Sequence, residues 1–315
     1  MNQARRRITA AIAAASLVPA FAQRGYATLI VPYGSGGNID TTARLLAEHL
    51  RGVLGQSVIV ENKTGAGGAI GITALTQSAP DGNTFLIGGV GTHLLPLMNK
   101  TVTYDPDKQL RPVALISAAP LLLVVRSDSP YRTLSDLLEA GKHKSLNFGS
   151  SGMGTTPHLA AEWLMAVTST PAVHIPYRGG SALTQAVLAG DVDFVIDPVL
   201  STAPFVKAGK LRALGVTVPG KIPGLPDVPA ISDTVAGYSV TSWLGFYLPA
   251  STPDAAAARL ESALKAVVDE PNVQAKLLEM GNRPSFKGSA EFQRFIGDET
   301  TRYGKLIAQQ NIRTQ

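Results

Sequence analysis

Residues 28–37 read TLIVPYGSGG, a short β-rich strand that runs into a glycine-rich turn. From Ala43 onward, apolar residues recur at three- and four-residue spacing, which predicts an amphipathic helix that Gly55 ends as a left-handed cap. Asn38 or Asp40 is positioned to cap the start of this helix. A strand, a glycine turn and a helix in this order are typical of an α/β domain with a mainly parallel sheet.

The same unit returns along the chain. An apolar stretch at 240–248 is positioned to return to the first half, and no linker rich in Gly, Pro or Ser separates two independent halves. We therefore expect two α/β domains that are joined by more than one crossing and that enclose a cleft. Further strands are predicted at residues 57–60, 84–88, 121–125, 146–148, 173–175, 192–196 and 211–217.

The composition excludes several classes of protein. The chain has 315 residues, of which 45% are hydrophobic and 16% charged, so it can bury the cores of about two domains. No apolar run reaches the ~20 residues that a membrane span requires. Aromatic residues make up only 6% and no basic cluster lies outside the N-terminal segment, which argues against nucleic-acid binding. The absence of cysteine excludes disulfides, thiolate chemistry and a lipid-anchored cysteine.

The first 22 residues have the pattern of a secretory signal peptide. Three arginines at 5–7 precede an apolar stretch at 8–18, and Ala20 and Ala22 form a small-x-small cleavage site. We therefore expect export to the periplasm and cleavage near Ala22. The sequence leaves open whether export follows the general or the twin-arginine route.

Two glycine-rich turns, at 33–37 and 149–156, are the main chemical signal. Each precedes a predicted helix, and a helix N-terminus presents unpaired N–H groups and about half a positive charge, so it binds anions without a basic side chain. Asp197 ends a predicted strand, and its carboxylate either accepts a hydrogen bond from a ligand or is solvated. Asp40 either complements the first helix or lies near a ligand's ammonium group. These patterns predict a site for a small anion.

Signatures of catalysis and of cofactor binding are weak. The segment 149–153 does not complete the nucleophile motif G-x-S-x-G, because Met153 occupies its last position. The five histidines lack metal-ligand spacing. The glycines at 65–71 depart from the dinucleotide fingerprint, and no Walker motif occurs. We therefore expect no enzyme activity, no cofactor and no metal. A hydrolase that uses Ser150 or Ser151 with a histidine is the alternative.

Several short motifs occur in order along nearly the whole chain that follows the signal segment. They are VPYxxGGxxDxxAR at 31–44, LGQxVxVENKxGAGG at 54–68, APDG at 79–82, PYRG at 176–179, GDVD at 190–193, KAGKLRAL at 207–214 and LPDVP at 225–229. Together they resemble the extracytoplasmic receptors of tripartite tricarboxylate transporters, the Bug-type solute-binding proteins. The chain departs from the family pattern at Gly34-Ser35, where a proline-containing pair is more usual, and at Pro198, where Asn is frequent.

The resemblance implies an α/β fold of the periplasmic binding protein kind, with two lobes, type II topology and a ligand cleft between its domains. Residues 23–122 plus 242–315 are expected to form the first domain and 123–241 the second. The implied function is capture of a small organic carboxylate and its delivery to the permease subunits of a tripartite tricarboxylate-type transporter. We expect a monomer. A ligand sensor for a membrane signalling partner is a further alternative.

The resemblance also implies which residues bind the ligand. Backbone amides and hydroxyls of the two glycine-rich turns hold one carboxylate, and the strand end at Asp197 faces the variable end of the ligand, as does the segment at 91–92. The predicted ligand-binding residues are Tyr33, Gly34, Ser35, Gly36, Gly37, Gly91, Thr92, Ser150, Gly154, Thr155, Thr156, Tyr177 and Asp197.

Overall fold

The computed structural model describes residues 25–309 and 312–313, so the predicted signal peptide, 1–22, lies outside the described residues. The strands are β1 (Tyr26–Val31), β2 (Ser57–Asn62), β3 (Thr84–Gly88), β4 (Leu110–Arg126), β5 (Leu146–Ser150), β6 (Ala172–Pro176), β7 (Phe194–Pro198), β8 (Leu211–Val216), β9 (Thr241–Pro249) and β10 (Arg283–Gly288). The α-helices are α1 (Asn38–Leu54), α2 (Ala69–Thr76), α3 (Gly91–Met98), α4 (Pro106–Gln109), α5 (Leu134–Gly141), α6 (Thr156–Thr168), α7 (Gly180–Ala189), α8 (Val199–Lys207), α9 (Asp254–Val268), α10 (Pro271–Glu279) and α11 (Ser289–Gln309).

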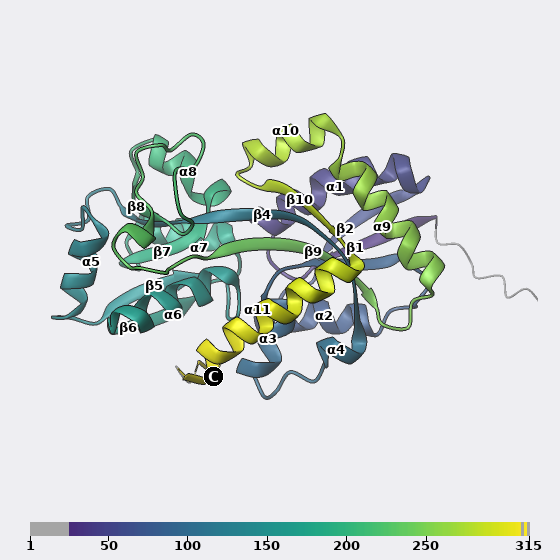
Figure 1. The fold of residues 1–315 in the computed structure, drawn as a ribbon, viewed down its shortest axis with the longest axis horizontal. Helices are drawn as coiled ribbons and strands as arrows, with labels where there is room; N and C mark the ends of the chain where they lie inside the picture. Colours follow the sequence, from purple (N-terminus) through teal and green to yellow (C-terminus); the bar gives the residue numbers. More distant parts are fainter. Residues whose placement is uncertain (1–24, 310–311, 314–315) are drawn as a thin grey trace, which may run out of the picture.

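The strands form one continuous sheet that serves two lobes (Figure 1). Its order is β2-β1-β3-β9-β4-β7-β5-β6, and β8 and β10 also pair with β4. Strands β1, β2 and β3 pair in parallel in one lobe, as do β5, β6 and β7 in the other. All pairings of β4 and β9 are antiparallel, so the expectation of a mainly parallel sheet holds only for the outer part of each lobe.

Strand β4 connects the two lobes. Over Leu110–Pro120 it pairs with β9, and part of this stretch also pairs with β10; from Leu121 its partners are β7 and β8. Its 17 residues are almost all buried, because helices or strands cover them along their whole length. An antiparallel strand inserted beside a parallel set in each lobe is the type II topology, so the predicted two-lobed α/β fold is confirmed.

Each lobe has apolar clusters on both faces of its part of the sheet. In the first lobe, one cluster lies beneath α1, α9 and α10 and the other beneath α2, α3 and α11. In the second lobe, one cluster lies beneath α5 and α6 and the other beneath α7 and α8. These cores pack helices against both faces of the sheet, so that the loops at the strand ends are carried by well-packed elements. No helix in the described part of the chain is both long and apolar enough to span a membrane.

The start of α1 differs from the expectation in one detail. Its N-cap is Gly37, and no side chain caps it, so neither Asn38 nor Asp40 is the cap. Asp40 lies in the first turn, where its charge complements the positive end of the helix. The predicted end is confirmed, because Gly55 adopts the left-handed conformation with φ 69°.

Candidate functional site

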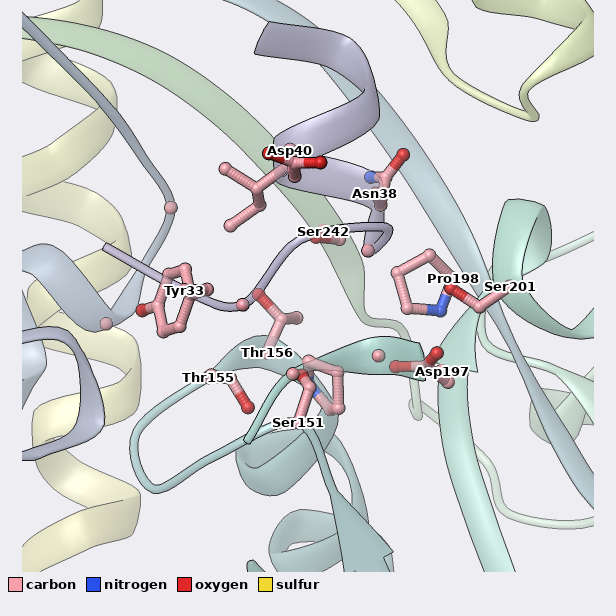
Figure 2. A pocket seen from close by; sticks show the side chains of 18 of the residues that line it. Tyr33, Asn38, Asp40, Ser151, Thr155, Thr156, Asp197, Pro198, Ser201 and Ser242 are labelled. Atoms are coloured by element: carbon pink, nitrogen blue, oxygen red, sulfur yellow. The ribbon is translucent and has the colours of Figure 1, made fainter. Parts of the chain in front are cut away.

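A cavity of about 60 Å³ lies between the lobes, where the starts of five helices meet. The first turns or flanking residues of α1 and α3 reach it from one lobe, and those of α6, α7 and α8 reach it from the other. Figure 2 shows Asn38 and Asp40 on one side of this cavity, Thr155 and Ser151 on another, and Asp197 beside Ser201. Since each helix start carries unpaired N–H groups and partial positive charge, the cavity favours an anionic group.

Seven of the thirteen predicted residues line this cavity, and six do not. The lining residues are Tyr33, Gly34, Gly37, Gly91, Thr155, Thr156 and Asp197. The others lie close by with different surroundings, and they are Ser35, Gly36, Thr92, Ser150, Gly154 and Tyr177. Gly36 lines a separate groove beside α7 and α8. Tyr177 lines another groove, described below, that adjoins the cavity. Thr92 is fully buried, and its carbonyl accepts a hydrogen bond from Tyr104.

Several lining residues were not predicted. Some of them immediately follow predicted turns, so taking more residues after each turn would have included them. Others lie on β9, the strand that returns from the second lobe, and the local sequence there gives no sign that they line a cavity. Ser151 lies within the predicted turn at 149–156, and a place near a ligand is one of the two roles predicted for Asp40. The lining residues that no prediction placed at a ligand are Asn38, Ile39, Gly89, Val90, Pro157, Gly179, Gly180, Pro198, Ser201, Ser242 and Trp243.

Asp40 lines the cavity, but its carboxylate is already engaged. It accepts hydrogen bonds from the backbone N–H of Gly36 at 2.9 Å, from Asn62 at 2.8 Å and from Arg44 at 3.0 Å. Burial alone would raise the pKa of Asp40, but these hydrogen bonds and the Arg44 charge outweigh it and hold the pKa below the ordinary value. Asp40 is therefore ionised, neutralised by Arg44, and fixes the first glycine-rich turn.

Asp197 has the opposite environment. It is 2% exposed at the end of β7, and within the described residues its Oδ2 atom has no hydrogen-bond partner. Burial raises its pKa to about 7, and hydrogen bonding from Ser201 only partly opposes this shift. The predicted strand-end carboxylate thus points into the cavity and is not solvated (Figure 2).

The two hydroxyls that begin α6 have different roles. Thr155 caps the helix: its Oγ1 accepts from the N–H of His158 and donates to the carbonyl of Gly152 at 2.7 Å. The hydroxyl of Thr156 is not engaged by any other described residue and lines the cavity. Thr156 therefore has a hydroxyl to offer to a ligand, whereas the Thr155 hydroxyl is committed to the turn.

Replacing Thr155 with valine should lower protein stability, because the N-cap and the bond to Gly152 are lost together. We expect a loss of about 1 kcal/mol, which lowers the melting temperature by about 1–2 °C in a chain of this size. Thermal unfolding measured by circular dichroism checks this, with Thr156→Val as the matched control. Equal melting temperatures for the two variants would contradict the assignment of Thr155 as the cap.

Ser150 contacts a histidine, but the geometry does not make it a nucleophile. Its Oγ lies 2.6 Å from Nε2 of His174, and it also bonds to the backbone of Gly152. Ser150 is fully buried and does not line the cavity. Burial, together with the neighbouring His158, lowers the pKa of His174 to about 3, so this imidazole is a weak base at neutral pH. The contact holds the turn that precedes α6.

Backbone contacts join the lobes directly across the cleft. A Cβ atom built on Gly34 would lie 2.5 Å from the carbonyl oxygen of Arg178, and one on Gly91 would lie 2.8 Å from that of Gly154. Ser181 donates a hydrogen bond to the carbonyl of Ser35 at 3.3 Å. The lobes are therefore closed on each other. The close contacts at Gly34 and Gly91 are possible because glycine has no side chain.

A wider groove of about 500 Å³ adjoins the cavity. The cavity and the groove share Tyr33, Gly34, Ser151 and Gly179, so these residues form the boundary between the two spaces. In the described part of the chain, no group of three or more His, Cys, Asp or Glu side chains is arranged to hold a metal ion.

Comparison with known proteins gives one consistent family. The family model described as "Tripartite tricarboxylate transporter family receptor" matches residues 42–312. A UPF0065 protein from the tcbD-tcbE intergenic region of Pseudomonas sp. (strain P51) is 33% identical, over 99% of this chain and 96% of its own length.

Solved structures agree with the sequence relatives. The structure of R. palustris Rpa4515 with adipate matches with a TM-score of 0.86 and 31% identity, covering 91% of this chain and 97% of that one. The periplasmic binding protein BugD matches with a TM-score of 0.86 and 28% identity, covering 92% of this chain and 98% of that one.

Proposed function

Because the chain belongs to the receptor family of the tripartite tricarboxylate transporters, we propose that it captures a small organic carboxylate in the cavity between its lobes and delivers it to the membrane subunits of such a transporter. The adipate in the structure of the relative Rpa4515 supports a carboxylate ligand. The match to BugD supports a periplasmic location, and hence export by the signal peptide predicted at residues 1–22.

One observation carries this proposal: helix starts from both lobes meet at a cavity that, among the described residues, no lysine, arginine or histidine lines. A carboxylate is bound in such a place by N–H groups and hydroxyls. Each charge-assisted hydrogen bond contributes roughly 1.5–3 kcal/mol, so three of them with apolar contact approach the ~8 kcal/mol of a micromolar complex. A metal or cofactor is not required.

We assign the carboxylate to the turns that precede α1 and α6. On the first lobe, Gly34 and Gly37 offer backbone groups close to the start of α1. On the second, Ser151 and Thr156 offer hydroxyls at the start of α6. A ligand that contacts both turns stabilises the closed arrangement of the lobes, since it binds the open arrangement through one turn only.

The lobes are proposed to move as two domains, residues 23–122 plus 242–315 and residues 123–241. The change of β4 partners between Pro120 and Leu121 supports the first boundary, and the start of β9 at Thr241 supports the second. Hinge motion at these crossings would open the cavity and expose a different surface to the membrane subunits in the closed form.

A thermal-shift screen with small carboxylates tests the function. A carboxylate present at about 100 times its dissociation constant stabilises the folded protein by about 2.7 kcal/mol, so the melting temperature should rise by several degrees. The matched primary amide of each active carboxylate is the control, because it has the same skeleton without the charge. If no carboxylate raises the melting temperature more than its amide, the proposal is wrong.

Replacing Thr156 with valine should weaken carboxylate binding by about tenfold or more, because it removes one hydrogen bond to a charged group while keeping the shape of the side chain. Stability should change little, because no described residue uses this hydroxyl. Calorimetric titration with a carboxylate that is active in the thermal screen measures the change. Unchanged affinity would exclude Thr156 from the site.

A further inference from the structure

The cavity contains one carboxylate, Asp197, that no cationic side chain of the described residues neutralises. Asp197 and Asp40 are the two acidic residues that line it, and Arg44 pairs with Asp40 at 3.0 Å. Asp197 has no such partner: the lining residues include no cation, and its Oδ2 atom makes no hydrogen bond within the described residues. A buried polar atom without a partner is costly, and such atoms in native proteins are usually satisfied by something that binds there.

The position of Asp197 relative to the free hydroxyls gives the cavity two chemically different ends. Thr156 and Ser151 lie at the start of α6, whereas Asp197 and Ser201 lie at the end of β7 and the first turn of α8 (Figure 2). One end therefore offers donors to an anion, and the other offers an acceptor.

We infer that the ligand is a small amino acid or a similar amino carboxylate, whose carboxylate binds at the start of α6 and whose protonated amine donates to Asp197. This inference rests on the proposed function and makes it more specific. An amine in this position supplies both the missing hydrogen bond to Oδ2 and the missing positive charge.

Other groups at this end fit less well. A second ligand carboxylate would bind there only if the two carboxyl groups held a proton between them, which costs free energy near neutral pH and so disfavours a plain dicarboxylate relative to an amine. A hydroxyl would satisfy Oδ2 but would leave the buried charge of Asp197 without a partner.

Matched ligands test the inference directly. Alanine, lactate and propionate differ only in the group on the second carbon, as do aspartate, malate and succinate. Calorimetric titration near neutral pH should give at least one amine that binds the unaltered protein roughly 30-fold or more tightly than its deaminated partner, since a buried hydrogen-bonded charge pair is worth that much. The hydroxy acid should bind with intermediate affinity.

The variant Asp197→Asn should remove most of this preference. It should bind the amine more weakly than the unaltered protein does, and the deaminated acid equally well or more tightly. Asp191→Asn, an exposed carboxylate six residues earlier, is the control and should keep the preference. The ranking in the unaltered protein needs no variant, so poor folding of Asp197→Asn would not prevent the test.

The outcomes separate this inference from the function on which it rests. Deaminated acids that bind as tightly as their amines, or an Asp197→Asn variant that keeps the preference, would overturn the inference and leave carboxylate capture intact. If none of the six compounds and no other carboxylate binds, the proposed function is wrong, and the inference is overturned with it.

Discussion

Replacing Asp197 with asparagine should raise the free energy of unfolding of the ligand-free protein at neutral pH by up to about 4 kcal/mol. Burial raises the pKa of this carboxyl group from 3.8 to about 7, so the folded state disfavours its ionised form. Each unit of pKa difference between the folded and unfolded states corresponds to about 1.36 kcal/mol. The value is an upper limit, because the amide of asparagine must itself find hydrogen-bond partners in the same place.

The effect should depend on pH with a definite sign. Below about pH 4, Asp197 is protonated in both states, so its ionisation costs nothing. Between about pH 4 and pH 7, the folded state holds a proton that the unfolded state has lost, so stability falls as the pH rises, and the cost is constant above this range. No cation from the described part of the chain lines the cavity, and the other acid that lines it, Asp40, is neutralised by Arg44. Asp197 alone should therefore account for the difference between the protein and its variant.

Urea unfolding at several pH values measures this difference. The unfolding free energies of the protein and of Asp197→Asn should agree near pH 4 and diverge as the pH approaches about 7. Asp191→Asn should follow the unaltered protein throughout, because this side chain is exposed. A constant offset between the two curves would contradict the buried, unpaired state of Asp197. A large increase in the unfolding free energy of Asp197→Asn would mean that the unaltered protein is less stable because it keeps an acid in its binding cavity.

Alanine at Gly34 and Gly91 together should weaken carboxylate binding more than any single change in the cleft. The new Cβ atoms would lie 2.5 and 2.8 Å from carbonyl oxygens of the opposite lobe, so the lobes could not close fully. Overpacking of this kind costs about 1–3 kcal/mol at each site, and each such cost weakens binding about 5- to 150-fold if it falls on the closed form alone. Neither glycine has a positive φ, so alanine suits the backbone of each lobe, and within its own lobe the Cβ of Gly91→Ala comes closest to the end of the Tyr33 side chain, at 3.1 Å.

Calorimetric titration and small-angle X-ray scattering together identify the cause. The double variant should lose affinity, stay larger than the unaltered protein when a carboxylate is added, and keep a similar melting temperature without ligand. Gly52→Ala is the matched control, because a Cβ there meets no atom within 4 Å and the residue lies in α1, far along the helix from the cleft. A double variant that binds normally would show that contact between the lobes is not needed for capture.

Much of the fold is predictable because its signals are local. The strand and turn at 28–37 lead directly into α1, and Gly55 ends that helix as expected. The turn at 149–156 leads into α6 in the same way. Hydrophobic period and glycine position act over a few residues, so a single sequence contains this information.

The missing parts of the prediction depend on distant contacts. The first half of β4, Leu110–Pro120, is a strand because β9 and β10 pair with it, and β10 itself lies between α10 and α11. Neither segment has the pattern that identified the other strands. Pairing with a partner more than a hundred residues away stabilises an extended conformation that local preference does not select.

The candidate site, too, is predictable from local sequence only in part. Local sequence is sufficient to identify helix starts as the anion-binding feature, because unpaired N–H groups belong to any helix. It does not distinguish Thr155 from Thr156, of which one hydroxyl caps the helix and the other is free for a ligand.

Nor does local sequence separate Asp40 from Asp197, which are both acids near helix starts. One is neutralised by Arg44, and the other is buried beside Ser201, with no cation next to it among the described residues. The charge state and availability of a side chain depend on which atoms surround it in three dimensions. In this protein those atoms come from both lobes, and only folding brings them together.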